Sequence, residues 1–522
     1  MSREEIRDDL AEALERRRRT GDEARPDAVE RRHGSGERTA RENLADLVDP
    51  DSFVEYGGLA IAAQRARREL DELVARTPAD GLIAGTGRIN GDLFGERAAC
   101  AVLSYDYTVL AGTQGAIGHR KKDRLFELIE RMRLPTVLFA EGGGGRPGDT
   151  DHAVVSALDT RAFALWARLS GLVPRIAIVS GRCFAGNAVL AGASDLIVAT
   201  TSTALGMGGP AMIEGGGLGS FEPDAIGPLA VQSRNGVVDV AVADEAEAVE
   251  VTKRLLSCFQ GSVTEWSAPD QLALRDLVPE RRRRAYDVRA VVEGLADHGS
   301  VTALREEFAP ELVTALGRIE GRAVGIVANN PIRLAGAITS DAADKAARFM
   351  ALCDAFELPI LSLIDTPGMM VGPDAEATAL VRHCSRLFIT GASLRVPFVA
   401  VILRKAYGLG AQAMAAGSMH EPLLTVGWPT AELGPMGLEG AVRLGFKREL
   451  EAIADEAERE ARVEQMVASA HEHAEALNAA TLFELDDVVD PAETRRLVAA
   501  TFAAATSRPG EPAAPRRFVD AW

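Results

Sequence analysis

The strongest constraint in this sequence is an internal repeat with a constant spacing of 224 residues. Ala111-Gly112 recurs as Ala335-Gly336, and Leu134-Pro135 recurs as Leu358-Pro359. The same spacing relates Lys121 to Lys345, Arg124 to Arg348 and Gly144 to Gly368. Self-similarity at a fixed spacing indicates one supersecondary unit used more than once. The sequence therefore predicts two tandem copies of one fold, aligned without a gap.

The pattern within each copy favours an α/β fold. Residues 97–104, 136–140 and 175–180 form short β-rich runs, and residues 121–132 have helical periodicity. Strands that alternate with helices are typical of α/β domains. A charge run and a helix at residues 278–297 interrupt the alternation. We therefore expect two domains, residues 1–290 and 291–522.

Charge and composition exclude several classes of protein. The 522 residues include 58 Lys and Arg against 76 Asp and Glu, a net charge of −18 that argues against a nucleic-acid surface. The arginine run at residues 281–284 is expected to be a solvated linker, with a phosphate contact as the lesser alternative. Five scattered cysteines without C-x-x-C spacing indicate neither a disulfide framework nor a zinc site. With no signal peptide and no apolar stretch of membrane-spanning length, we expect a cytoplasmic protein.

Two small-residue turns, one in each copy, are the candidate sites. The 224-residue spacing carries Gly186 onto Gly410, and each lies where a strand runs into an Ala-rich helix. One interpretation is that glycine merely permits a tight connection. The other is that N–H groups at the helix start stabilise an oxygen that becomes negative in a transition state. On the second interpretation, two carbonyl compounds meet between the halves.

Other chemistries lack the motifs that they need. Residues 365–368 match a nucleotide-switch tetrapeptide, but no phosphate-binding P-loop occurs. No G-x-G-x-x-G, H-E-x-x-H or G-x-S-x-G motif is present in a suitable context, so dinucleotide, zinc-protease and serine-hydrolase functions are unsupported. No residue is an obvious nucleophile or base. The proton acceptor is therefore expected to arrive with a substrate or cofactor, and no metal site is indicated.

Several segments resemble one known family. They are ERTARENLADLVDPDSFVEYG in the first half and, in the second half, GRIEGRAVGIVANNP, SDAADKAARFMALCDAFELPIL, IDTPG, RKAYGLGAQAM and GWPTAELGPMGLEGAV. Together they resemble the carboxyltransferase (β) subunit of biotin-dependent acyl-CoA carboxylases, in the crotonase superfamily. The segments GLGAQAMAAGS and LEGAVRLGFKREL are most similar to the carboxyltransferase part of single-chain or long-chain acyl-CoA carboxylases.

The resemblance implies two crotonase-like β-β-α superhelix domains in a hexamer built as a trimer of dimers. Active sites would lie at dimer interfaces, between the N-half of one subunit and the C-half of another. Each N-half would bind acyl-CoA and each C-half the biotin of a carrier protein. The implied residues fall into three groups: Ala185, Gly186, Leu409 and Gly410 as oxyanion donors; Lys121, Gly144, Arg146 and Gln412 on the substrate; and Tyr407, Gly408 and Gly368 on biotin.

The implied reaction is carboxyl transfer from carboxybiotin to the α-carbon of an acyl-CoA. Carboxybiotin releases CO2, the biotin enolate removes the α-proton, and the thioester enolate attacks CO2. Because the chain has no Met-Lys-Met biotinylation sequence, the biotin would come from a separate α subunit with biotin carboxylase and carrier activities.

The chain departs from the family pattern at three places. Ala185 stands where the family has glycine, Gln412 replaces an acid that tunes acyl length in short-chain enzymes, and residues 141–146 read EGGGGR. These departures predict an altered acyl pocket and leave the CoA-side contacts open. A structural salt bridge is the alternative role for Lys121.

Two other functions remain open at this stage. A biotin-independent decarboxylase of a malonyl-type CoA ester would use the same oxyanion holes, because it forms the same enolate. An inactive paralogue would only assemble with active subunits.

Overall fold

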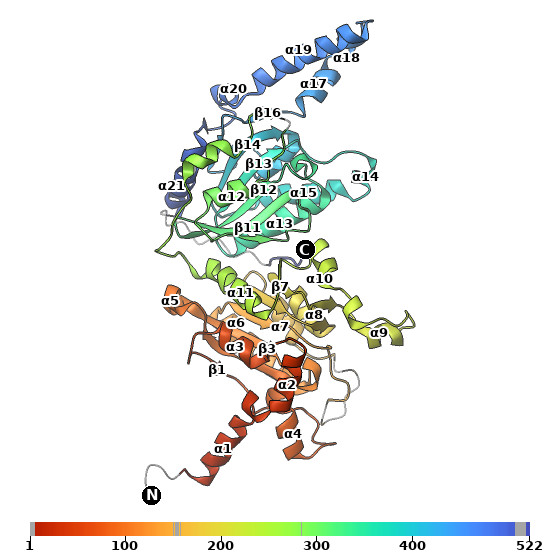
Figure 1. Cartoon of the computed structure of the whole chain (residues 1–522), viewed down its shortest axis with the longest axis vertical. Coiled ribbons are helices and arrows are strands. Elements are labelled where there is room, and N and C mark those ends of the chain that lie inside the picture. Colours follow the sequence, from red (N-terminus) through yellow and green to blue (C-terminus); the bar gives the residue numbers. More distant parts are fainter. Residues whose placement is uncertain (1–5, 150, 152–155, 157, 283, 507–517) are drawn as a thin grey trace. The chain divides into compact units, whose positions relative to one another are not determined.

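The computed structural model describes all residues except 1–5, 150, 152–155, 157, 283 and 507–517 (Figure 1). The chain divides into two compact units: unit 1 comprises Met1–Gly261 and Pro515–Ala521, and unit 2 comprises Ser262–Ala514 and Trp522. The segment at residues 278–297 lies within unit 2, where Val291 and Leu295 of helix α12 (Arg289–Leu295) are fully buried in the core. The charge run therefore leads into a packed helix.

Unit 1 is built on one mixed sheet of seven strands in the order β1-β2-β3-β4-β5-β7-β9. The first three strands pair antiparallel and the others pair parallel, while β6 and β8 form a separate parallel pair. The strands are β1 (Val54–Glu55), β2 (Leu82–Arg88), β3 (Ala99–Tyr105), β4 (Thr136–Phe139), β5 (Arg175–Val179), β6 (Arg182–Phe184), β7 (Leu196–Thr200), β8 (Ala204–Gly206) and β9 (Val240–Val242). The helices are α1 (Asp8–Arg18), α2 (Pro26–Gly34), α3 (Ala40–Leu47), α4 (Leu70–Arg76), α5 (Gly91–Phe94), α6 (Ala116–Met132), α7 (Ala162–Arg168), α8 (Gly186–Gly192), α9 (Pro210–Gly215), α10 (Leu229–Arg234) and α11 (Glu245–Gln260).

Unit 2 repeats this plan. Its sheet has the order β10-β11-β12-β13-β14-β15-β17, with β16 paired to the end of β14. The strands are β10 (Thr302–Leu304), β11 (Leu312–Ile319), β12 (Arg322–Asn329), β13 (Ile360–Thr366), β14 (Phe398–Tyr407), β15 (Leu424–Gly427), β16 (Glu432–Gly434) and β17 (Asp487–Val488). The other helices are α13 (Ser340–Ala355), α14 (Pro373–Glu376), α15 (Leu380–Ala392), α16 (Gly408–Met414), α17 (Leu438–Gly445), α18 (Lys447–Glu451), α19 (Glu456–Ala474), α20 (Ala476–Thr481) and α21 (Thr494–Thr506).

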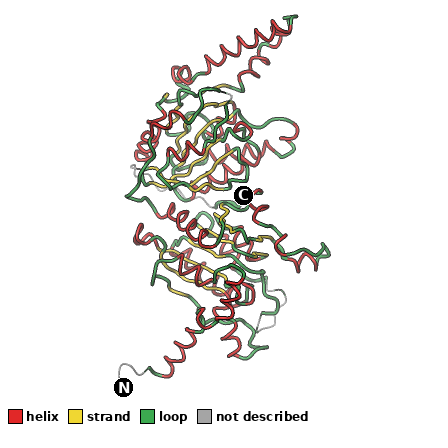
Figure 2. The backbone as a smooth tube through the Cα atoms, viewed as in Figure 1, coloured by secondary structure: helices red, strands yellow, loops and turns green. Residues whose placement is uncertain are grey.

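In both units the parallel strands form a buried layer with helices packed against it (Figure 2). Strands β4, β5, β7 and β13 are buried along their whole length, which explains their nearly continuous apolar sequences. In unit 1, Phe126 of α6 and Trp166 of α7 pack into the same core as the sheet residue Leu103. The predicted strands and helix of the first half are therefore confirmed, with shifts of a few residues at their ends.

An unusual turn after the third strand of each sheet supports the duplication. Leu110, Ala111 and Gly112 have φ values of 51°, 54° and 62°, and Leu334, Ala335 and Gly336 have 45°, 55° and 80°. Residues with a Cβ seldom adopt positive φ. The same rare backbone thus recurs at the 224-residue spacing, as expected for two copies of one unit.

The gapless alignment, however, is wrong from β5 onwards. Thr136 pairs with Arg175 in unit 1, and Ile360 pairs with Phe398 in unit 2. The first members of these pairs are 224 residues apart, but the second members are only 223 apart, because the connection to β14 is one residue shorter. Gly186 is therefore equivalent to Leu409, Ala185 to Gly408, and Asn187 to Gly410. The spacing alone could not reveal this shift, because both turns are rich in small residues.

Candidate active site

The bend in unit 1 joins β6 to α8 at Ala185, which caps the helix. Ala185 has φ 50° and ψ −121°, a backbone conformation that is strained for a residue with a Cβ. Its equivalent in unit 2, Gly408, has φ 56° and carries no side chain. The two bends thus share a backbone shape, but unit 1 adopts it with alanine.

The amide of Ala185 is already engaged in the fold. Its N–H donates to the carbonyl oxygen of Gly206 at 3.2 Å. This hydrogen bond occupies the donor that the family resemblance assigned to a thioester oxygen. The next two residues, Gly186 and Asn187, open α8, and first-turn N–H groups have no acceptor within their own helix. The first-turn amides of α8 thus lie one residue beyond the predicted pair, and this shift matches the strand register.

Asn187 is a site residue that the sequence pattern did not reveal. Its side chain is fully buried, and its Nδ2 donates to the carbonyl oxygens of Glu141 at 2.9 Å and Gly112 at 3.3 Å. The amide group therefore ties the start of α8 to the loop after β4. The signal in the sequence is that asparagine follows the glycine of the turn, but its importance depends on a register that only the strand pairing reveals.

A glycine loop packs against each bend. Gly144 has φ 85°, and a Cβ built on it would lie 2.6 Å from the Cβ of Ala185. In unit 2, a Cβ on Gly410 would lie 2.6 Å from the Cα of Gly368. The predicted residues Gly144 and Gly368, which are 224 positions apart, thus touch the predicted bends of their own units. These contacts leave no room for a side chain on Gly144 in unit 1 or on Gly410 in unit 2.

A hollow of about 690 Å³ lies beside the bend of unit 2. Gly408, Leu409 and Gln412 of α16 line it, and the Leu409 side chain is 62% exposed. Much of the remaining wall is apolar: Ala406, Ala411, Met419, Leu433, Pro435, Leu438 and Ala470. Tyr407 is buried, and its hydroxyl donates to Glu432 Oε2 at 2.9 Å. The first turn of α16 and this hollow form the candidate site of unit 2.

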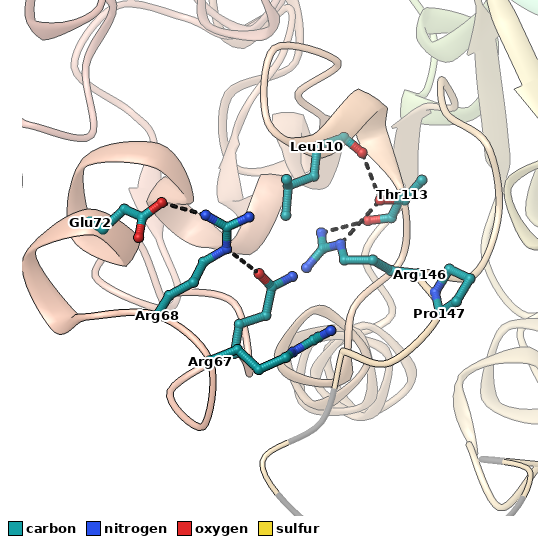
Figure 3. A pocket seen from close by; sticks show the side chains of 8 residues that line it. Arg67, Arg68, Glu72, Leu110, Thr113, Arg146 and Pro147 are labelled. Carbon is teal, nitrogen blue, oxygen red and sulfur yellow. Dashed lines mark hydrogen bonds and ion pairs between the residues drawn. The ribbon is translucent and has the colours of Figure 1, made fainter.

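A second hollow, of about 580 Å³, lies in unit 1 (Figure 3). Arg146 lines it, but its guanidinium pairs with Asp80 at 2.7 Å and Asp149 at 3.2 Å, so its charge is neutralised within the fold. Arg67 and Arg68 lie on the opposite part of the wall and are exposed. Arg68 pairs with Glu72. Arg146 therefore shapes this hollow, while Arg67 is exposed and donates to the carbonyl oxygen of Gly148.

Lys121 binds the main chain. Its Nζ donates to the carbonyl oxygen of Ala79 at 3.0 Å and to that of Leu82. Lys345 does the same in unit 2, with the carbonyls of Phe308 at 2.8 Å and Leu312 at 2.6 Å. Burial lowers the pKa of Lys121 to about 8 and that of Lys345 to about 7. Lys121 therefore has a structural role within unit 1, and its expected roles as a substrate contact or a salt bridge stay predictions.

We expect Lys345→Met to destabilise unit 2 by about 3 kcal/mol, because buried carbonyls would lose their donor. The pKa of Lys345 is lower in the folded state, so its contribution to stability grows as the pH rises from about 7 towards the unfolded value of 10.5. The difference in free energy of unfolding between the wild type and Lys345→Met should therefore be larger at pH 9 than at pH 7. Urea denaturation followed by tryptophan fluorescence measures this difference. The exposed Lys447→Met is the control, and an equal loss there would contradict the structural role.

Comparisons with known proteins identify the family of the chain. The carboxyl transferase domain family matches residues 31–518. The chain belongs to this family. It is 33% identical to the methylmalonyl-CoA carboxyltransferase 12S subunit of Propionibacterium freudenreichii subsp. shermanii, over 93% of this chain and 92% of that protein. It is 32% identical to the biotin-dependent long chain acyl-coenzyme A carboxylase beta4 subunit of Mycobacterium tuberculosis, over 94% and 92%.

Solved structures give the same relationship. A single-chain, multi-domain long-chain acyl-CoA carboxylase superposes with a TM-score of 0.91 at 57% identity, over 95% of this chain and 49% of that one. The chain thus spans about half the length of that protein. The hexameric transcarboxylase 12S, crystallised with methylmalonyl-CoA, superposes with a TM-score of 0.83 at 30% identity, over 98% of both chains. The predicted family and the crotonase-like α/β fold of this carboxyl transferase are confirmed.

Membrane spans and metal clusters are both lacking among the described residues. No helix in that part of the chain has the length and apolar character to cross a bilayer. No group of three or more His, Cys, Asp or Glu side chains among the same residues is placed to hold a metal ion.

Proposed function

We propose that this carboxyl transferase moves a carboxyl group from carboxybiotin, carried on a separate protein, to the α-carbon of an acyl-CoA. The observation that carries the proposal is the pair of equivalent bends, each followed by a helix whose first-turn N–H groups have no acceptor within that helix, and each packed against a glycine loop. The names of the relatives, which include acyl-CoA carboxylase subunits and a methylmalonyl-CoA carboxyltransferase, support the same chemistry.

Each unit would hold one carbonyl compound. In unit 1, the N–H groups of Gly186 and Asn187 would bind the thioester oxygen. In unit 2, those of Leu409 and Gly410 would bind the ureido oxygen of biotin. The hollow beside Leu409 supports this division, since its small and apolar wall suits a bicyclic ring.

The backbone supplies the catalysis in this proposal. Removal of the α-proton places negative charge on the thioester oxygen, and two pre-oriented amides stabilise that charge without reorganisation. Carboxybiotin would supply the carboxyl group and the proton acceptor. Because the bend residues Ala185, Gly186, Leu409 and Gly410 carry no ionisable side chain, their contribution is to position the reactants and stabilise charge.

The partner would be an α subunit with biotin carboxylase and carrier activities, and the assembly a homo-hexamer. The hexamer assembly of the related transcarboxylase 12S supports the ring. All five cysteines are free and buried, which is compatible with the reducing cytoplasm.

The decisive experiment mixes the hexamer with its α subunit, ATP, labelled bicarbonate and acyl-CoAs from acetyl to stearoyl. Acyl-CoA-dependent incorporation of label supports the proposal. No incorporation with any chain length, together with release of CO2 from malonyl-CoA in the absence of biotin, would establish the decarboxylase instead. Mixed rings with an active subunit and no CoA binding would establish the assembly paralogue.

We further propose that the preferred substrate is a long-chain acyl-CoA. The single-chain relative at 57% identity is a long-chain acyl-CoA carboxylase, and the β4 subunit acts in a long-chain enzyme. The exposed, uncharged Gln412 lines the hollow proposed for biotin, so an acyl chain that reaches the transfer site would end against it. A carboxylate at this position would hold water against the alkyl chain, and the uncharged amide therefore supports this preference.

Gln412→Asp is expected to lower kcat/KM for palmitoyl-CoA about tenfold relative to propionyl-CoA, because an alkyl tail would have to displace the hydration of the new charge. Gln412→Ala removes the amide without adding charge and is expected to keep the preference. Competition between the two acyl-CoAs measures the ratio. An unchanged ratio in Gln412→Asp would show that this position does not contact the chain.

A further inference from the structure

A buried hydrogen-bonded chain of side chains lies behind the bend of unit 1. Lys122 of α6 is fully buried, and its Nζ donates to Gln114 Oε1 at 2.6 Å. Gln114 Nε2 in turn donates to Asn187 Oδ1 at 3.1 Å. Asn187 Nδ2 completes the chain at the carbonyl oxygens of Glu141 and Gly112. We call Lys122, Gln114 and Asn187 the relay.

The direction of every hydrogen bond in the relay follows from its first member. An ammonium group only donates, so it must face the amide oxygen of Gln114. The Gln114 NH2 group then faces Asn187, which turns the Asn187 NH2 group towards the two main-chain carbonyls. In its protonated form, Lys122 therefore orients two side-chain amides, and the second of them anchors Asn187 in the first turn of α8.

The relay also lies against the neighbouring residue of the bend. A Cβ built on Gly186 would lie 3.0 Å from Gln114 Nε2 and 3.0 Å from Phe163 Cζ. Gln114 and Phe163 thus form the surface on which the Gly186 peptide rests. Both proposed donors of unit 1, the amides of Gly186 and Asn187, are supported from behind by the same group of side chains.

Unit 2 builds its bend without such a relay. The strand register makes Gly410 equivalent to Asn187, while the 224-residue spacing, which still holds at α6 and α13, makes Ile338 equivalent to Gln114 and Ala346 to Lys122. Ile338 and Ala346 are both fully buried. The fold therefore accommodates apolar residues at these positions, and the relay belongs to the acyl-CoA side alone.

The relay is costly to the fold. Moving an ammonium group out of water is unfavourable when its hydrogen-bond partner is neutral. The rings of Tyr105 and Phe163, each 5.8 Å from Nζ, offset part of this cost. Burial lowers the pKa of Lys122 to about 7. Lys122 lowers the stability of the fold, and unit 2 has Ala346 at the equivalent position. We take this difference to indicate a role in function.

We propose that Lys122 and Gln114 are positioning residues that hold the Gly186 and Asn187 amides in the orientation that binds the thioester oxygen. This inference rests on the proposed function, because it assigns the relay to the reaction of an acyl-CoA at this bend. Neither residue touches the substrate. Their effect passes through Asn187 and the peptide of Gly186.

Lys122→Met and Gln114→Glu separate positioning from simple structural support. Lys122→Met removes the orienting charge, and we expect kcat to fall about 30-fold with less than a threefold change in the KM for acyl-CoA. Gln114→Glu strengthens the contact with Lys122 but cannot donate to Asn187, so kcat should fall similarly while the melting temperature stays the same or rises. Arg131→Met, at an exposed position of the same helix, is the matched control.

Hydrogen–deuterium exchange in the same hexamers gives a readout that does not depend on turnover. Lys122→Met should raise exchange at least threefold in peptides covering residues 184–189 and leave residues 407–413 unchanged. If both variants keep wild-type kcat and exchange, the relay has no positioning role. If exchange changes but the wild type carboxylates no acyl-CoA, the proposed function fails and the relay still orients the bend.

Discussion

Replacing Leu409 with proline is expected to lower carboxyl transfer by about 10²–10³-fold, the usual loss when one oxyanion donor is removed. Proline deletes the backbone N–H at this position and nothing else of consequence. The Leu409 side chain is 62% exposed, proline is tolerated in the first turn of a helix, and the preceding residue, Gly408, is the one best able to precede proline. The helix should therefore survive.

Leu409→Ala is the matched control, because it removes the same side chain and keeps the amide. We expect its rate to stay within a few-fold of the wild type. Both variants are assayed with the α subunit at saturating acyl-CoA, and circular dichroism checks that both remain folded. If Leu409→Pro transfers carboxyl groups at the rate of Leu409→Ala, the amide of Leu409 is not a donor in the transition state.

Gly144→Ala should reduce turnover about 100-fold, since it displaces the bend of unit 1. The new Cβ would lie 2.6 Å from the Cβ of Ala185, and φ at this position is 85°. Contacts this short do not occur, so the loop or the bend must move. A shift of this kind misaligns the Gly186 and Asn187 amides, and transition-state stabilisation depends steeply on their geometry.

The neighbouring Gly145 offers a close control, because a Cβ there would meet nothing within 4 Å. Gly145→Ala is expected to keep its activity. The double variant Gly144→Ala/Ala185→Gly removes the contacting methyl group and should recover at least tenfold of the lost rate. Steady-state kinetics measures all three. Equal losses in Gly144→Ala and the double variant would mean that backbone strain at residue 144, and not the contact with Ala185, causes the defect.

The outcomes at individual residues show what a repeat can and cannot predict. Gly144 and Gly368 were singled out by their spacing, and each touches its bend. Lys121 and Lys345 were paired by the same spacing, and both bind main-chain carbonyls. The spacing therefore identified equivalent positions correctly in the part of each unit before β5 and β14. It could not distinguish a lysine that binds a ligand from one that completes a buried backbone, because that depends on which carbonyls lie within its reach.

The relay is a group of residues that the sequence pattern did not reveal. Lys122 belongs to an ordinary helical pattern, Gln114 to the segment before that helix, and Asn187 to a small-residue turn. Their connection requires α6, the segment before it and α8 to converge, and no local pattern in the sequence contains that information.

By itself, the sequence determined the duplicated α/β fold, the family and the two small-residue bends. Apolar periodicity, repeat spacing, motif wording and residue size can all be read directly from the order of the residues. Tertiary structure decided the rest. It set the one-residue shift that makes Gly186 equivalent to Leu409, because the connection that leads to β14 is one residue shorter than the connection that leads to β5. It also decided that the Ala185 N–H is engaged within the fold, because the pairing of β6 with β8 brings the carbonyl oxygen of Gly206 to it. Hydrogen-bond partners of this kind are chosen by the packed chain as a whole.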